Sequence, residues 1–152
     1  MIENLREKIF AWILKRQAAR NVVMPQWNTA RTVAVLYPND NIQHIIKKIE
    51  KDEKEVVVFT LPDKKQINWF TERPKTELRE LLTARQFDLL IDLTQQPSLT
   101  MLYMAMDIQA DFKVGRFIRE GIHDLTIDTA PQEAPDYLFE QILKYIKVFG
   151  RR

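Results

Sequence analysis

One strand–helix–strand unit constrains the fold more than any other part of the chain. It runs from Phe87-Asp-Leu-Leu-Ile-Asp-Leu-Thr-Gln-Gln-Pro-Ser98 to Ala110-Asp-Phe-Lys-Val-Gly115. The first segment is typical of a buried strand followed by a polar turn that opens a helix, and the second of a strand ending on glycine. Two strands joined in this way lie parallel in one sheet, and ligands of such folds bind beside the turn that follows the first strand.

Strands and helices alternate along the rest of the chain. The predicted strands cover residues 32–37, 55–61, 66–70, 87–93, 111–117 and 123–128. The predicted helices cover residues 2–20, 40–52, 74–85, 97–109 and 135–149. This alternation predicts an α/β fold, a three-layer αβα arrangement with a central, mainly parallel sheet. Residues 25–152 are expected to form a single domain, to which residues 1–24 append an amphipathic helix and a connector.

Composition excludes several classes of function. The only glycines are Gly115, Gly121 and Gly150, so neither a dinucleotide-binding fingerprint nor a P-loop can be written. Ser98 is the only serine and opens a helix, which argues against a serine hydrolase. The chain has no cysteine, and neither His44 nor His123 belongs to a metal-binding pair, so we predict no metal and no cofactor. The alternative for His123, beside Asp124, is a metal or acid–base role.

Charge and hydropathy limit the expected location and partners. With 23 basic and 21 acidic residues, the net charge of +2 does not predict a nucleic-acid partner. The longest apolar runs are far shorter than the ~20 residues of a membrane span. Charged residues near the N-terminus interrupt what would be the apolar part of a signal peptide. We therefore expect a cytoplasmic protein.

Polar side chains at the end of strand 87–93 are the best candidates for a site. Asp92 and Thr94 share one face and lie near the carboxyl end of the strand. A buried carboxylate there needs a partner, so Asp92 either serves a ligand or accepts backbone N–H bonds from a loop. The turn that follows and the neighbouring loops add candidate ligands for a small anion, namely Gln95, Gln96, Ser98, Lys64 and Arg116.

Two apolar surfaces are candidates for contact with a protein partner, a second copy of the chain or a membrane. Helix 97–109 is apolar nearly all round, which predicts burial beneath the N-terminal helix or docking of another chain. In residues 2–20, one arc holds Ile2, Leu5, Ile9, Trp12 and Ile13. We expect this arc to pack on the domain near Tyr103 and Met104, with a dimer contact or an anionic membrane surface as the alternatives.

The whole chain resembles an uncharacterised family of small bacterial proteins. The resemblance is carried by the basic N-terminal helix, the Phe87-Asp-Leu-Leu-Ile-Asp-Leu strand, the Ala110–Gly115 segment and the closing helix with Tyr145-Ile-Lys. More distantly, residues 32–117 are similar to the N-terminal, Rossmann-like half of heptosyltransferase-like glycosyltransferases. There Val33-Ala-Val-Leu-Tyr-Pro-Asn-Asp40 matches, with Asn39 in place of a glycine, and the resemblance implies that Asp40 is a catalytic base. From the residues alone, Asp40 is expected to cap the helix that follows it.

The expected function is that of a non-catalytic α/β binding module. Its partner is another protein or a small anionic ligand, held at the carboxyl edge of the sheet. One alternative is a nucleotide-sugar-related, glycosyltransferase-like half-domain that uses Asp40. The other is a peripheral membrane-surface protein attached through residues 1–20.

Overall fold

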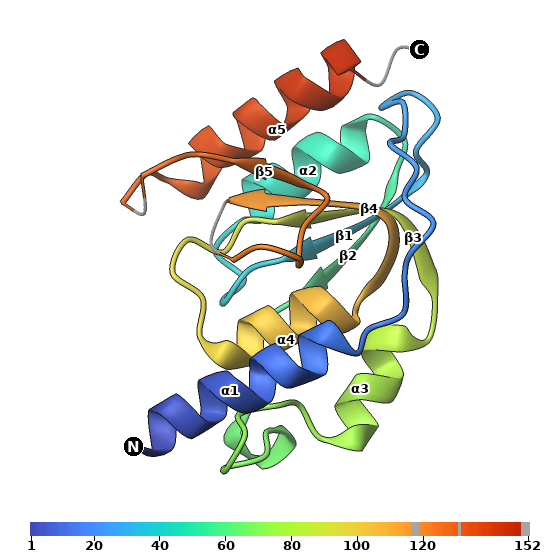
Figure 1. The fold of residues 1–152 in the computed structure, drawn as a ribbon. Helices are drawn as coiled ribbons and strands as arrows, with labels where there is room; N and C mark the ends of the chain where they lie inside the picture. Colours follow the sequence, from blue (N-terminus) through green and yellow to red (C-terminus); the bar gives the residue numbers. More distant parts are fainter. Residues whose placement is uncertain (117–118, 131, 150–152) are drawn as a thin grey trace.

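Five parallel strands form one sheet in the order β2-β1-β3-β4-β5 (Figure 1). The computed structural model describes residues 1–116, 119–130 and 132–149. The strands are β1 (Thr32–Leu36), β2 (Glu55–Phe59), β3 (Gln86–Asp92), β4 (Gln109–Arg116) and β5 (Leu125–Ile127). The helices are α1 (Ile2–Lys15), α2 (Gln43–Lys51), α3 (Thr76–Thr83), α4 (Leu99–Asp107) and α5 (Pro135–Phe149), with a 3-10 turn, η1, at Lys64–Gln66. The predicted α/β fold with a parallel sheet and an N-terminal helix is confirmed.

Helices cover both faces of this sheet, which is why its strands are apolar on both sides. Side chains of Ala34, Leu36 and Leu90 pack with α3 and α4 on one face. Alternate residues, such as Val35 and Ile91, pack with α2 and α5 on the other face. The period of two along each strand therefore divides the apolar residues between two cores.

The strand order places a topological switch point between β1 and β3. From β1 the chain passes through α2 to β2 on one side, and β3 then pairs with β1 on the other side. Leu36, Asp92 and Gly115 lie opposite one another at the carboxyl ends of β1, β3 and β4. In doubly wound sheets of this order, the carboxyl edge at the switch point is the usual ligand site.

Helix α4 is buried along its whole length between the sheet and α1. The contact is made by Phe10, whose ring lies 4.7 Å from that of Tyr103 in an edge-to-face arrangement. Burial of α4 beneath the N-terminal helix is thus confirmed (Figure 1). The predicted contact face of α1 is right only for Ile13, which packs inward with Phe10 and Leu14. It is wrong for Leu5 and Trp12, which stay exposed.

The prediction is also wrong in the length of the first helix and in the strand expected at residues 66–70. The first helix ends at Lys15 rather than at residue 20, because the chain from Arg16 onward bonds to β4: Arg20 donates to the Ala110 carbonyl and Val23 N–H to that of Asp111. The predicted strand 66–70 is instead a loop after η1, closed by a single antiparallel bridge between Ile67 and Pro74. Phe117, the predicted end of a strand, lies outside the described residues.

Candidate functional site

The carboxyl edge of the sheet holds a buried carboxylate–imidazole pair. Asp92 Oδ2 lies 2.8 Å from His123 Nε2, and the two side chains are only 4% and 1% exposed. Asp92 Oδ1 accepts the backbone N–H of Thr94 at 3.0 Å. Asp92 therefore has the structural role that the sequence allowed, since it holds the loop after β3, and it has a second partner in His123.

Gly115 makes room for this pair. It lies beside Asp92 in the sheet register. A Cβ atom at residue 115 would lie 2.8 Å from His123 Nε2 and 3.1 Å from the Asp92 Cβ. The glycine near the end of β4 is thus needed for close approach of the imidazole to the sheet, not for a phosphate-binding turn.

The pair has the carboxylate–imidazole hydrogen bond of a proton-transfer site, but it lacks access to solvent. An imidazole held by a carboxylate through one nitrogen can exchange a proton through its other nitrogen. His123 Nδ1 and the nearby Thr94 Oγ1 have no hydrogen-bond partner among the described residues, but both atoms are buried. In this conformation the pair is closed to solvent, so its unpartnered atoms can serve a ligand only after the covering loops open.

Most of the other predicted residues at this edge hold the loops together. Ser98 Oγ accepts the Met101 N–H and caps α4. The Arg116 guanidinium donates to the carbonyls of Gln95 and Thr129, so it clamps two loops. Gln96 is exposed.

The remaining two candidates, Asp40 and Lys64, do not join the pair. Asp40 is exposed and does not cap α2, which starts at Gln43 without a side-chain cap among the described residues. The predicted capping bond is therefore wrong, and Asn39 instead accepts the Asn41 N–H, two residues on. Lys64 lies in η1 and has no hydrogen bond or ion pair to Asp92, Thr94 or Arg116 in the described part of the chain.

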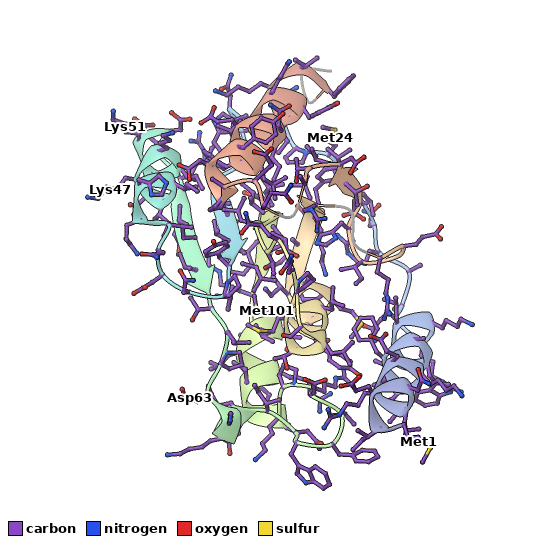
Figure 2. All side chains as sticks on the ribbon, turned by 90° about the vertical axis from the view of Figure 1, so that its left-hand side faces the viewer. Met1, Met24, Lys47, Lys51, Asp63 and Met101 are labelled. Carbon is purple, nitrogen blue, oxygen red and sulfur yellow. The ribbon has the colours of Figure 1, made fainter. Side chains whose placement is uncertain are left out.

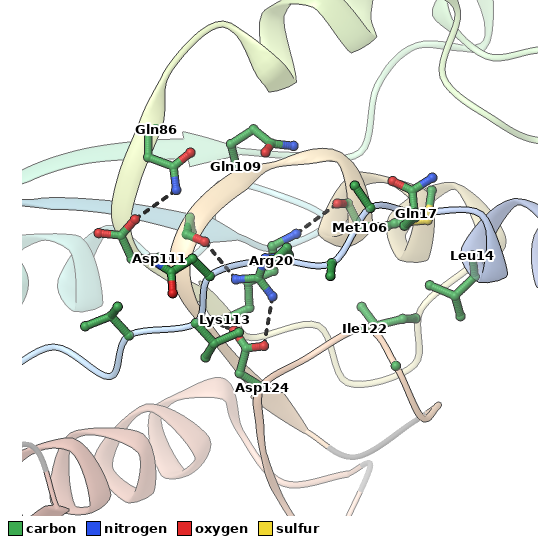
Figure 3. A pocket seen from close by; sticks show the side chains of 17 residues that line it. Leu14, Gln17, Arg20, Gln86, Met106, Gln109, Asp111, Lys113, Ile122 and Asp124 are labelled. Carbon is green, nitrogen blue, oxygen red and sulfur yellow. Dashed lines mark hydrogen bonds and ion pairs between the residues drawn. The ribbon is translucent and has the colours of Figure 1, made fainter.

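A cavity lies at the opposite edge, beside the amino ends of β3, β4 and β5. It has a volume of about 720 Å³ and runs between residues 17–23 and β4 (Figure 3). Arg20 closes one side by donating to Asp124 Oδ1 at 2.8 Å and to the Ala110 carbonyl at 2.7 Å. Asp124 Oδ2 also accepts the Lys113 N–H.

Lys113 is the unusual group in this cavity. Its side chain is buried, and Nζ donates to the Ala105 and Met106 carbonyls at the end of α4, each at 2.8 Å. Burial lowers the pKa of its amine to about 7. Lys113 stands between Phe112 and Val114 in the middle of a strand, which is a signal in the sequence that the sequence prediction did not weigh. Because both bonds are to backbone carbonyls, the chief role of the amine is to bond the free carbonyl groups at the end of α4.

Helix α1 exposes apolar side chains to solvent along one face. We define its outer face as Ile2, Leu5, Lys8, Ile9, Trp12, Lys15 and Arg16, which lie together at the helical period. Trp12 is 57% exposed, and the Arg16 guanidinium lies 4.1 Å from its ring centroid. The outer face contains cations and no acid. Glu7 points elsewhere and pairs with Arg119, and Arg6 donates to the carbonyls of Trp69 and Phe70.

The described residues contain neither a cluster of metal ligands nor a helix that could cross a membrane. No group of three or more acidic or histidine side chains is placed to hold a metal ion in that part of the chain. No described helix combines the length and the hydropathy that crossing a bilayer requires.

Comparison with known proteins identifies a family. Residues 35–149 match the family described as "Family of unknown function (DUF6913)". The chain belongs to this family, which agrees with the resemblance to an uncharacterised family noted in the sequence. No curated protein and no solved structure matches the chain.

Proposed function

We propose that this member of the family is a peripheral membrane-surface protein that binds anionic bilayers through the outer face of α1. The observation that carries the proposal is the segregation of charge on this helix. Its acids lie away from the outer face, whereas Lys8, Lys15 and Arg16 flank the exposed apolar residues.

The position of α1 suits a flat partner. Figure 1 shows α1 outside α4, on the far side of α4 from the sheet. A bilayer beneath the outer face would therefore meet the helix lengthwise and leave the sheet and α5 free. An in-plane helix of this kind buries its apolar side chains among the lipid headgroups and keeps its cations at the headgroup phosphates.

The composition of the outer face matches a membrane interface. Trp12 offers an aromatic ring with a polar N–H, which is the combination enriched at headgroup depth. Each lysine or arginine near an anionic surface contributes about 1 kcal/mol. The apolar and cationic contributions add to each other in the binding of an interfacial helix.

Vesicle binding tests the proposal. The intact chain is mixed with phosphatidylcholine vesicles, with and without phosphatidylserine, and the bound fraction is measured by co-sedimentation. We expect binding only to the anionic vesicles, with an affinity that falls as salt rises. Trp12→Ala should weaken it at least about tenfold (~1.4 kcal/mol), and Lys8→Gln should weaken it about fivefold.

Leu81→Ala is the matched control. Leu81 is 64% exposed, on α3, and Glu77 and Glu80 are near it in sequence. Its truncation should leave vesicle binding unchanged. Equal binding of wild type and Trp12→Ala, or no binding of wild type, would contradict the proposal. A concentration-dependent dimer that Trp12→Ala disrupts would instead assign the outer face to a second copy of the chain.

A second candidate function is ligand binding at the carboxyl edge. Two buried polar atoms without a described partner, His123 Nδ1 and Thr94 Oγ1, support it, because such atoms usually have a protein, water or ligand partner. Citrate, a small anion, is a suitable probe. If the edge binds it, titration should shift the backbone NMR signals of Thr94 and Gln95 and leave those of α3 unchanged. Signals at Thr94 that do not move would reject citrate-like anions as ligands of this edge.

A further inference from the structure

A second cavity, of about 620 Å³, lies between the loop after η1 and the start of α3. Its lining carries four cationic side chains, Lys65, Arg73, Lys75 and Arg79, and one acid, Glu77. Cations from a loop and from a helix thus meet in one hollow. An excess of positive charge in a concave site attracts anions.

The loop that carries these cations is held in place by its own hydrogen bonds. Asn68 N–H donates to the Arg73 carbonyl at 2.8 Å, and Lys75 N–H donates to that of Gln66 at 2.7 Å. Thr100 of α4 donates its hydroxyl to the Glu72 carbonyl at 2.6 Å. The cavity is therefore largely formed before any ligand arrives, which reduces the ordering cost of binding.

The cations in the cavity have few protein partners. Arg73 pairs with Asp107 at 3.6 Å, and the only side-chain hydrogen bond of Arg79 among the described residues is to Thr76 Oγ1, at 3.4 Å. The Nε atoms of both arginines are buried without a hydrogen-bond partner among the described residues. Lys65 and Lys75 form no ion pair with any residue that the structure describes. The exposed side chains of Lys65 and Lys75 are available to an anion, whereas the buried Nε atoms of the two arginines can serve one only after the guanidinium groups reorient.

The amino end of α3 adds to the positive potential at the cavity. Lys75 is the residue before the helix, and within the described residues no side chain caps the free N–H groups of the first turn. Uncapped N–H groups and the positive end of the helix dipole favour an anion at this end. Guanidinium groups bind the oxygens of a phosphate in a paired geometry.

We propose that this cavity binds a phosphate group. The group is a phosphate monoester, either of a soluble compound or of a lipid headgroup. The cavity lies on the same side of the molecule as α1. Arg6 of α1 bonds to the backbone of this loop at Trp69 and Phe70, and Met1 and Asp63 lie at the same end of the molecule (Figure 2). Trp69, next to the lining residue Asn68, is 78% exposed. The phosphate site goes beyond the membrane contact of α1 and does not depend on it.

Calorimetric titration of the intact chain with inorganic phosphate tests the site without any membrane. We expect saturable binding of one phosphate, and Lys75→Gln and Arg79→Gln should each weaken it at least about tenfold. Lys64→Gln is the control, because this lysine is next to Lys65 but does not line the cavity. It should leave the affinity unchanged. Lys75 is exposed, so its variant keeps the test valid if Arg79→Gln does not fold.

Vesicles distinguish the two sources of the phosphate. Phosphatidic acid presents a monoester, whereas phosphatidylserine presents a diester. Preference for phosphatidic acid at equal vesicle charge, lost in Lys75→Gln and kept in Lys64→Gln, would assign the site to a lipid headgroup. Phosphate binding in solution without that preference would assign it to a soluble compound. Binding that Lys75→Gln does not weaken, or no binding of either probe, would overturn the phosphate site even if α1 binds membranes.

Discussion

His123 lies so close to Gly115 that residue 115 has no space for a side chain. The same Nε2 atom that faces Gly115 is bonded to Asp92 Oδ2 at 2.8 Å, so the imidazole cannot move away without breaking a buried bond. The carboxyl edge therefore depends on the pairing of a glycine in one strand with a histidine in the loop before the next strand.

We expect Gly115→Ala to destabilise the protein by about 1–3 kcal/mol, because the added methyl group overpacks a buried contact. Urea unfolding measures the change. The same substitution in a His123→Ala background should cost clearly less, since the two nearest atoms belong to the imidazole and only the Asp92 Cβ, at 3.1 Å, remains. Equal costs in both backgrounds would show that His123 is not the group that excludes a side chain at residue 115.

The two faces of α1 should respond differently to truncation. Phe10 is fully buried against Tyr103, so Phe10→Ala should cost about 3–5 kcal/mol and release the helix from α4. Leu5→Ala, on the outer face, should change stability by less than about 0.5 kcal/mol. Thermal unfolding of both variants checks this. Comparable losses would mean that the outer face is covered by protein in solution.

The fold was predictable because its elements carry strong local signals. The strands contain continuous apolar runs such as Val56–Phe59 and Leu89–Ile91, and the chain between these two is long enough for a helical crossover. The parallel order follows from that alternation. The packing face of α1 was not predictable, because two arcs of this helix are apolar. Only the position of Tyr103 shows that Phe10 is the residue that packs inward.

The candidate site was predictable only in part. Asp92 and Thr94 were found because parallel strands bring their carboxyl ends together. Their partner His123 is 31 residues from Asp92 in sequence, and no local pattern indicates that pairing. The cationic cavity was missed for the same reason. In the sequence, Arg73 and Arg79 resemble ordinary surface residues. Only the fold places both beside the amino end of α3.

Stability should depend on pH through Lys113. Burial lowers the pKa of its amine to about 7 in the folded protein, from the ordinary value of 10.5 that applies to the unfolded chain. Between these two values the unfolded chain binds more protons, so the free energy of unfolding rises with pH. Below about pH 7 both states are protonated, and the cost of the buried charge is fully present and constant.

Comparison of wild type with Lys113→Met isolates this effect, because all other titrating groups are common to both proteins. Between about pH 7 and about pH 9, wild type should gain roughly 2 kcal/mol of stability relative to the variant, at up to about 1.4 kcal/mol for each pH unit. Urea unfolding across this range measures the gain. Lys47→Met, at an exposed lysine on α2, is the control and should follow wild type at every pH. If the Lys113→Met curve runs parallel to wild type instead, the amine keeps its charge when buried, and the carbonyls of Ala105 and Met106 bind an ammonium throughout this range.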